Sequence, residues 1–305
     1  MSMDAEQTAL LAGTLREVLS RSPEDVDARL ADLGWDEVVA GDPAAAAMLL
    51  FTEHGRALAV TDLLDRAVLD TLGVAAAAVC YPVTGDTPTA DAHRTEGILL
   101  RAPIAGSTIA VPLAEGTVGL VSADALTAEP MRTFDPSVTW HAVTGPAAEP
   151  TAAAPWAEAV AAAHRCLAAE LIGTAGEVLR LAVEHTSSRT QFGAPIAAFQ
   201  AVRHRLADAH VAIAAAQSLL DAAFLAGSAA SARAAKAQAG RAHELASGHA
   251  LQVCGAMGSS LEHPLHTFVS RGVVLDALLG GWGEQVAALG RDVLTTGTTP
   301  LLIDV

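Results

Sequence analysis

Positive charge is scarce in this chain. Lysine and arginine total 18 against 34 aspartates and glutamates, so the formal net charge is −16 with neutral histidines. Such a charge repels the phosphates of nucleic acids and the headgroups of anionic lipids. The balance argues against general nucleic-acid binding and polybasic membrane docking, while a local basic pocket for an anionic cofactor stays compatible with it.

Cysteine is rare too. The three cysteines, Cys80, Cys166 and Cys254, show no C-x-x-C spacing, so neither a zinc site nor a disulfide framework is indicated. The first residues lack the basic and apolar stretches of a secretory signal. Apolar runs such as residues 74–79 are too short to span a bilayer. We expect a cytoplasmic protein with reduced thiols and no bound metal.

Aromatic side chains are also few. They make up 4% of the 305 residues, whereas hydrophobic residues make up 51%, and much of that share is alanine. Alanine favours helices and adds little volume to a core. The composition therefore excludes a largely disordered chain and predicts long, closely packed helices.

The hydrophobic spacing divides the chain into three segments. Residues 1–73 are predicted to form an N-terminal helical domain, residues 74–150 a reduced middle β-domain, and residues 151–305 a C-terminal antiparallel four-helix bundle. The expected fold class is mainly α with a small β segment. The helices expected in the first segment cover residues 10–19, the stretch from a Ser22-Pro23-Glu24-Asp25 start signal to Gly34, residues 43–50 and residues 56–72.

The other two segments differ in their periodicity. Short β-branched runs between turn residues predict four to six strands, among them residues 97–100, 107–112, 117–121 and 138–143. The bundle helices are expected at residues 152–184, 195–226, 228–253 and 264–279. Polar residues 186–188 are expected to break the chain between the first two of these helices.

One stretch of the bundle carries a distinctive polar pattern. It reads Ser188-Arg189-Thr190-Gln191-Phe192-Gly193-Ala194-Pro195-Ile196. We expect a helix end, a glycine-containing turn and a new helix that begins near Pro195. A guanidinium, a side-chain amide and a helix N-terminus together suit a phosphate or another anion. On these residues alone, an ordinary helix connection is an equally good interpretation.

The pattern R-x-Q-F-G-x-P-I-x-x-F-Q-x-V, followed by L-A-D at residues 206–208, resembles the C-terminal signature of acyl-CoA dehydrogenases. A second similar segment spans residues 251–258 and continues into Glu262-His263-Pro264-Leu265-His266 and Arg271. Its E-H-x-L-H form resembles actinobacterial enzymes that oxidise sterol side chains. Residues 169–173 and 33–35 also match the family. The resemblance covers the second half of the chain well and the first half loosely.

The resemblance implies a cofactor, FAD, in a groove between the middle and C-terminal domains that a neighbouring subunit closes. Arg189, Gln191 and Phe192 would contact the FAD of the partner subunit, and Gln252 and Gly255 would line another stretch of it. Glycine at 255 would let the backbone approach the cofactor closely. Cys254 and Ala256, the neighbours of Gly255, depart from the family pattern.

The catalytic base of the family is missing. The reaction needs a carboxylate that removes the α-proton of an acyl-CoA while the β-hydrogen leaves as hydride to the flavin. One family position for that carboxylate falls on Leu279 or Gly280, and the other falls on Ala163. The middle domain is reduced as well, since residues 103–107 are at most a remnant of the family's flavin loop. No catalytic residue is therefore expected in this chain.

Other polar groups lie near these motifs. In the family, an acid at the place of Glu262 looks structural and pairs near the arginine that matches Arg271. Asp276 and Glu284 read as solvated or capping acids, and the basic cluster at residues 203–205 reads as a helix face. The pair His263 and His266 has no evident third metal ligand, so these histidines are expected to be polar helix residues.

The function predicted is that of an acyl-CoA dehydrogenase subunit without its own base. It would complete the FAD site of a paralogous catalytic partner in an α2β2 heterotetramer. The complex would catalyse the α,β-dehydrogenation of an acyl-CoA, and a steroid-CoA is one candidate substrate. Two alternatives stay open. One is a self-sufficient flavoenzyme with a relocated base such as Glu262 or Glu284. The other is a scaffold subunit without flavin.

Overall fold

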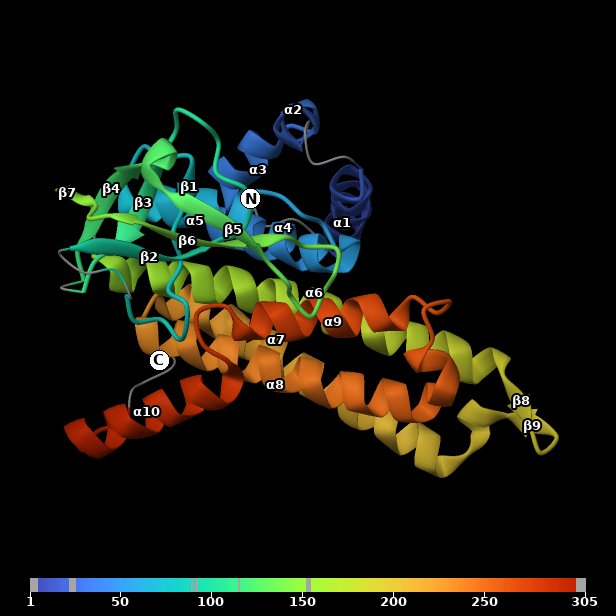
Figure 1. The fold of residues 1–305 in the computed structure, drawn as a ribbon. Helices are drawn as coiled ribbons and strands as arrows, with labels where there is room; N and C mark the ends of the chain where they lie inside the picture. The colour runs from blue at the N-terminus through green and yellow to red at the C-terminus, as the bar shows by residue number, and fades with distance from the viewer. Residues whose placement is uncertain are drawn as a thin grey trace.

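Helices lie at both ends of the described chain, and the strands that belong to the small β segment lie between them. The computed structural model describes residues 5–21, 26–88, 90, 93–114, 116–151 and 155–299. The mainly helical fold class with a small β segment is confirmed, as Figure 1 shows. Division of the chain into domains at residues 73/74 and 150/151 stays a prediction. The Ser22–Asp25 start signal and the expected helix start at Ala152 lie outside the described residues.

Five helices form the first segment: α1 (Ala5–Leu19), α2 (Val26–Asp32), α3 (Trp35–Gly41), α4 (Pro43–Ala57) and α5 (Leu63–Leu72). The prediction that residues 56–72 form one helix is wrong. Arg56 belongs to α4, which ends at Ala57, and Leu58 follows with a positive φ of 50° that stops the helix. The short helix α3 is an addition to the predicted set, and it begins directly after Gly34.

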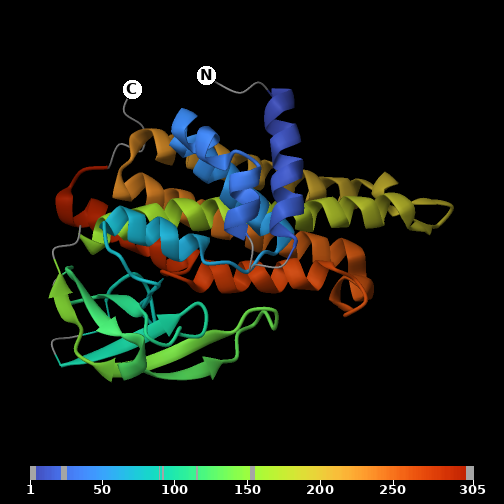
Figure 2. The same ribbon diagram turned by 90° about the horizontal axis from the view of Figure 1, so that it is seen from above.

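Two small sheets form the middle segment. The first has the order β1 (Ala78–Val79), β3 (Thr108–Pro112), β4 (Val118–Ser122) and β7 (Glu149–Thr151); the second has β2 (Arg94–Leu99), β6 (Trp140–Pro146) and β5 (Thr127–Met131). These seven strands exceed the predicted four to six, because β1 has only two residues, while β5 and β7 carry no apolar run long enough to mark them. Figure 2 shows the strands on one side of the helices, opposite α1.

The described part of the C-terminal segment holds three long helices and two shorter ones. They are α6 (Trp156–Ser188), α7 (Gln200–Ala226), α8 (Ala229–Cys254), α9 (Leu265–Ala277) and α10 (Trp282–Thr296). The predicted polar break at residues 186–188 is wrong, because α6 continues to Ser188. The hydroxyls of Thr186 and Ser188 donate to the carbonyls of Ala182 and Glu184, so these polar residues stay helical.

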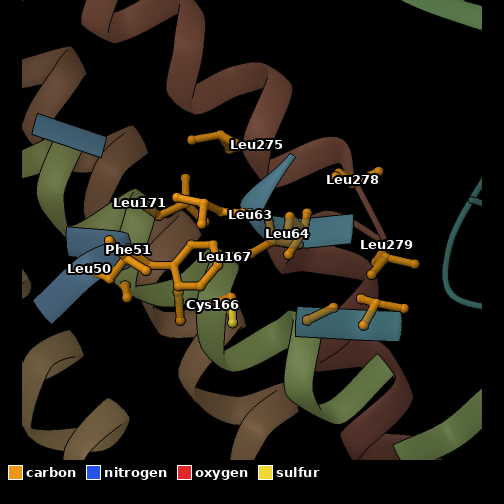
Figure 3. Packing of buried hydrophobic residues seen from close by; sticks show 14 of the residues in the cluster. Leu50, Phe51, Leu63, Leu64, Cys166, Leu167, Leu171, Leu275, Leu278 and Leu279 are labelled. Carbon is orange, nitrogen blue, oxygen red and sulfur yellow. The ribbon is translucent and has the colours of Figure 1, made fainter. Parts of the chain in front are cut away.

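The helices α4 and α6 cross at a very short distance. A Cβ on Gly173 would lie 2.1 Å from the carbonyl oxygen of Thr52, and one on Gly55 would lie 2.1 Å from that of Glu170. Both positions therefore require glycine. Beside this crossing, Phe51, Leu167 and Leu171 pack in one cluster with α5 and the end of α9, as Figure 3 shows.

A buried ion pair ties the bundle to the other two segments. Arg271 of α9 and Asp135, in the loop before β6, are 2% and 1% exposed, with 2.6 Å between Nε and Oδ2. Arg271 also donates to the carbonyl of Ala59 and to the hydroxyl of Ser137. Burial alone would raise the pKa of Asp135, but hydrogen bonds from Ser137 and Arg271 outweigh it and lower that pKa. One guanidinium thus joins all three segments.

A second buried polar contact joins α5 to Tyr81, two residues after the end of β1. The hydroxyl of Tyr81 donates to Oδ1 of Asp65 over 2.9 Å, and Arg101 lies on the other side of that carboxylate. Burial raises the pKa of Asp65 to about 7, although Tyr81 and Arg101 act to lower it. The fold therefore favours the neutral form of this acid.

This pKa predicts a pH dependence of stability. The folded state holds the proton of Asp65 more tightly than the unfolded state does. The free energy of unfolding should therefore fall as the pH rises from about 4 to about 7. We expect Asp65→Asn to remove that fall, measured by urea denaturation at each pH. Asp70→Asn, at an exposed position of the same helix, is the control that should keep it. An unchanged slope in Asp65→Asn would contradict the assignment.

The helix α7 has an unusual surface. By length and composition alone it would be able to cross a membrane, and 28% of its apolar window is buried. Ala209, Ala216 and Leu220 pack into the bundle, whereas Val211 and Leu225 are 65% and 80% exposed. Exposed apolar side chains of this kind are typical of a helix that packs into its own bundle on one face and contacts another protein on the opposite face.

Candidate functional site

The R-x-Q-F motif forms a projecting hairpin. Strands β8 (Thr190–Gln191) and β9 (Ala194–Pro195) pair across Phe192 and Gly193, whose φ angles are 55° and 80°. Positive φ at both central residues is what a tight two-residue turn demands. The hairpin lies at the far end of the bundle, as Figure 1 shows.

The prediction that a helix begins near Pro195 is wrong. Pro195 sits in β9, residues 196–198 form a single 3₁₀ turn, and α7 begins only at Gln200. Proline fits the edge of so short a hairpin because its missing N–H is not needed there. The N-terminus of α7 therefore lies about five residues after Pro195, where the predicted anion site had placed it.

The hairpin side chains face outward. Arg189 and Gln191 are exposed. Phe192 has a positive φ, and its side chain is 94% exposed. Its ring meets that of Phe199 edge-on at 6.3 Å. A bulky residue held in a strained turn with its ring in solvent points to a contact outside this chain.

The second motif lies where α8 ends. Gln252 is exposed in the last turn, and Gly255 follows with φ 59° and ψ −144°, a conformation that side chains disfavour. No heavy atom lies within 4 Å of a Cβ placed on Gly255. The backbone at this position is thus open to a close approach from outside.

The structure brings the five predicted residues to one end of the bundle. Neighbouring contacts link the helices there: Arg205 reaches Nδ1 of His249 at 3.2 Å, and the rings of His185 and His263 lie 5.7 Å apart. Within residues 155–299, all described, no hydrogen bond or ring contact joins Arg189, Gln191 or Phe192 to Gln252 or Gly255. Their roles as cofactor ligands stay a prediction.

The positions where the resemblance would place the base, Leu279 or Gly280 and Ala163, are all buried. Ala163 is fully buried, and Leu279 is 1% exposed with its side chain in the hydrophobic core, as Figure 3 shows. The Leu279 carbonyl accepts hydrogen bonds from His164 Nε2 at 3.1 Å and Gln285 Nε2 at 2.5 Å. Lys236 Nζ donates to the Gly280 carbonyl. The loop between α9 and α10 is therefore packed against its neighbours and held by these hydrogen bonds.

The groups that hold this loop are electrostatically unusual. Burial, followed by the charge of Lys236, lowers the pKa of His164 to about 3, so the imidazole is neutral at pH 7. Burial lowers the pKa of Lys236 to about 8, although the carboxylate of Asp276 acts to raise it. Sequence reasoning missed Lys236 because its neighbours in α8 are alanines.

Other acids near the loop cap a helix. Both oxygens of Asp276 accept from the backbone N–H of Trp282 at 3.1 and 3.2 Å, and Glu284 accepts from that of Gly281 at 3.2 Å. These two carboxylates thereby accept hydrogen bonds from backbone N–H groups at the N-terminus of α10. Burial raises the pKa of Asp276. Glu284 remains exposed.

The expected pairing of Glu262 near Arg271 is wrong. Arg271 binds Asp135, whereas Glu262 is exposed beyond the end of α8 and its backbone N–H donates to the hydroxyl of Ser260. Arginine turns inward here because the loop before β6 supplies a buried carboxylate. Among the described residues no three histidine, cysteine, aspartate or glutamate side chains gather as a metal site would require.

A cleft separates the middle segment from the bundle. Two cavities of about 230 and 430 Å³ lie along it and share Asp86, Thr87 and Arg233. Arg233 binds Oδ2 of Asp86 at 2.9 Å, and Trp156 Nε1 donates to the Asp86 carbonyl. Gln285 Oε1, which is buried without a partner, belongs to a residue that lines the larger cavity. The volumes reach only the lower range of ligand pockets.

Comparison with known proteins identifies the fold and the family. Residues 157–287 match the model of the acyl-CoA dehydrogenase C-terminal domain. The chain is 31% identical over 315 aligned residues to acyl-CoA dehydrogenase IpdE2 of Mycolicibacterium smegmatis, which covers 95% of this chain and 99% of that one.

Solved structures of the same fold include the Tcur3481–Tcur3483 steroid acyl-CoA dehydrogenase G363A variant, with TM-score 0.80 and 23% identity over 96% of this chain and 98% of that chain. The ChsE4–ChsE5 complex of Mycobacterium tuberculosis has TM-score 0.78 and 20% identity over 96% and 99%. A glutaryl-CoA dehydrogenase of Mycobacterium smegmatis, solved with FADH2, has TM-score 0.70 and 15% identity over 98% of this chain and 96% of that chain.

FAD is the cofactor of proteins of this kind. The outward guanidinium of Arg189, the amides of Gln191 and Gln252 and the open backbone of Gly255 suit a diphosphate-bearing group that approaches from outside. The small divided cleft of this chain suits such a group poorly. Sequence motif, fold and curated relative agree: this chain belongs to the acyl-CoA dehydrogenase family.

Proposed function

We propose that this chain is the non-catalytic subunit of a heteromeric acyl-CoA dehydrogenase of the cytoplasm. It pairs with a paralogous catalytic subunit as α2β2 and completes the FAD site of that partner. The observation that carries the proposal is a contrast between two sites. The outward Arg189-x-Gln191-Phe192 hairpin is retained, whereas both base positions are buried apolar residues, Leu279 and Ala163.

The division of labour follows from this contrast. When bound, FAD accepts the hydride that the substrate loses. The residues of this chain would bind and orient it: Arg189 and Gln191 as hydrogen-bond donors, Phe192 by ring contact, and Gln252 and Gly255 along its length. The partner would supply the base that removes the α-proton. Leu279 cannot do so, because its side chain is apolar and in the core.

The surface of the chain supports a partner. In α10 only Gln285 is buried, while Val286 and Leu294 are 52% and 86% exposed. Together with the uncovered face of α7, they leave apolar side chains for another subunit to cover. Two structural neighbours, Tcur3481–Tcur3483 and ChsE4–ChsE5, are pairs of different proteins, and the first is a steroid enzyme. A steroid-CoA or another bulky acyl-CoA is accordingly the proposed substrate class.

Co-expression with a paralogous acyl-CoA dehydrogenase subunit tests the assembly. Native mass spectrometry should give two copies of each chain, and flavin should copurify with the complex. This chain purified alone should be a colourless species. A stable yellow homo-oligomer of this chain alone would overturn the proposal.

A self-sufficient enzyme with a relocated base is the second candidate, because Glu284 lines the larger cavity of the cleft. The proposal predicts that Glu284→Gln and Glu262→Gln leave turnover of the complex within about twofold of the unmodified rate, since a lost base would cost about 10²–10⁴-fold. Steady-state turnover with an acyl-CoA and an artificial electron acceptor measures this. Loss of turnover in either variant would favour the second candidate.

A further inference from the structure

A hollow larger than either cavity beside Asp86 lies in the helical N-terminal segment. It is a groove of about 940 Å³ between α1, the end of α3, α4 and one residue of α7. It shares no lining residue with the two cavities beside Asp86. Nothing in the proposed function uses it.

Small side chains explain why the groove is open. Leu15 and Leu19 anchor the second half of α1 in the core, where they are 0% and 2% exposed. The first half instead presents Ala9 and Ala12 toward Ala45 of α4. Alanines on facing helices leave a gap that larger side chains would fill. The walls are consequently apolar and preformed.

The two ends of the groove differ in charge. At one end, Glu53 is 1% exposed and both of its oxygens are taken, by Arg16 Nε and by Arg56 NH1, each at 2.8 Å. Two guanidinium groups thus face one carboxylate, and this end carries a net positive charge. Arg56 is 34% exposed and makes no other hydrogen bond within the described parts of the chain. Its remaining N–H groups are available to a ligand.

The other end is acidic. Glu37 and Asp42 line it at the junction of α3 and α4. Asp42 caps α4 by accepting from the Ala45 N–H at 3.0 Å, and its carboxylate keeps further acceptor sites. Asp42 and Arg56 stand at opposite ends of α4, about 20 Å apart at 1.5 Å per residue.

We propose that this groove binds an elongated alicyclic carboxylic acid of sterol size, with its carboxylate on Arg56 and a hydroxyl at the Glu37–Asp42 end. The apolar walls suit a hydrocarbon skeleton, and the volume falls within the range of drug-sized ligand pockets. A rigid fused-ring skeleton matches an open, preformed groove better than a flexible acyl chain, because it loses less conformational entropy on binding.

Calorimetric titration of the full chain with 3β-hydroxychol-5-enoate, kept below its micellar concentration, tests the proposal. We expect saturable one-to-one binding. The methyl ester of this acid, or the Arg56→Gln variant with the acid, should raise Kd about tenfold or more, since each removes a charge-assisted hydrogen bond. Palmitate should bind more weakly than the ring acid.

Filling the groove gives an independent test. Ala45→Phe should abolish binding, whereas Ala44→Phe, one residue away on α4 and outside the groove lining, should retain it. Thermal melts establish that each variant is folded; should Arg56→Gln unfold, the ester and Ala45→Phe decide alone. Absence of saturable binding, equal Kd for acid and ester, tighter binding of palmitate, or unchanged binding by Ala45→Phe would overturn the proposal. None of these readouts depends on flavin or turnover.

Discussion

Replacement of Arg271 by methionine is expected to lower the free energy of unfolding by about 3–5 kcal/mol. The substitution leaves the carboxylate of Asp135 buried without its cation, at a point that is 1% exposed. It also removes the donors to Ala59 and Ser137, and so loosens the joint between the bundle and both other segments. Urea denaturation at pH 7, followed by circular dichroism, measures the change.

Arg180→Met is the matched control. Arg180 is 55% exposed on α6, and it pairs with Glu184, which is 68% exposed, and with Glu177, which is 11% exposed. Such pairs contribute about 1 kcal/mol or less. If Arg271→Met lowered the free energy of unfolding as little as Arg180→Met does, the role of Arg271 in joining the three segments would be contradicted.

The contribution of Asp135 to stability should depend on pH. Because the pKa of Asp135 is lowered in the folded state, this contribution is present above the unfolded pKa of about 3.9 and is lost as the pH falls through the folded pKa.

Loss of flavin is the expected result of Arg189→Ala in the heteromeric complex. If the outward guanidinium holds the diphosphate of FAD in the partner site, its removal should weaken FAD binding about tenfold to a hundredfold, as for other hydrogen bonds to charged groups. The ratio of flavin absorbance to protein, after gel filtration at micromolar concentration, measures this. Phe192→Ala should act in the same direction.

Surface arginines elsewhere provide the comparison. Arg180→Ala should leave the flavin content unchanged, since Arg180 lies along α6 and is already paired with Glu177 and Glu184. Full flavin content in Arg189→Ala would contradict the proposed role of the hairpin. Flavin that is absent even from the unmodified, correctly assembled complex would favour a scaffold subunit instead.

Periodicity predicted the long helices of this fold and missed their ends. The helix α10 lies outside the predicted set, although Val286, Leu289 and Val293 recur at helical spacing. The start of α7 was placed at Pro195 because proline often opens a helix. Here the adjacent pairing of Thr190 with Pro195 decides the conformation, and that is a contact between residues on either side of a turn.

The site shows the same limit. The motif residues Arg189 to Phe192 were found because their order is distinctive, and the structure places them outward. That Arg271 binds Asp135, and not a group near Glu262, depends on a loop 136 residues away in sequence. Burial of Lys236 against the carbonyl of Gly280 is equally invisible in an alanine-rich helix. Such contacts follow from packing of separate elements, which no local pattern encodes.

The bleaching of flavin absorbance by an acyl-CoA tests the central claim most directly. Anaerobic titration is made with this chain alone, supplied with FAD, and with the complex that includes the paralogous subunit. The account predicts bleaching only in the complex, because this chain has Leu279 and Ala163 where a base would stand. Bleaching by this chain alone, at a rate similar to that of the complex, would contradict it.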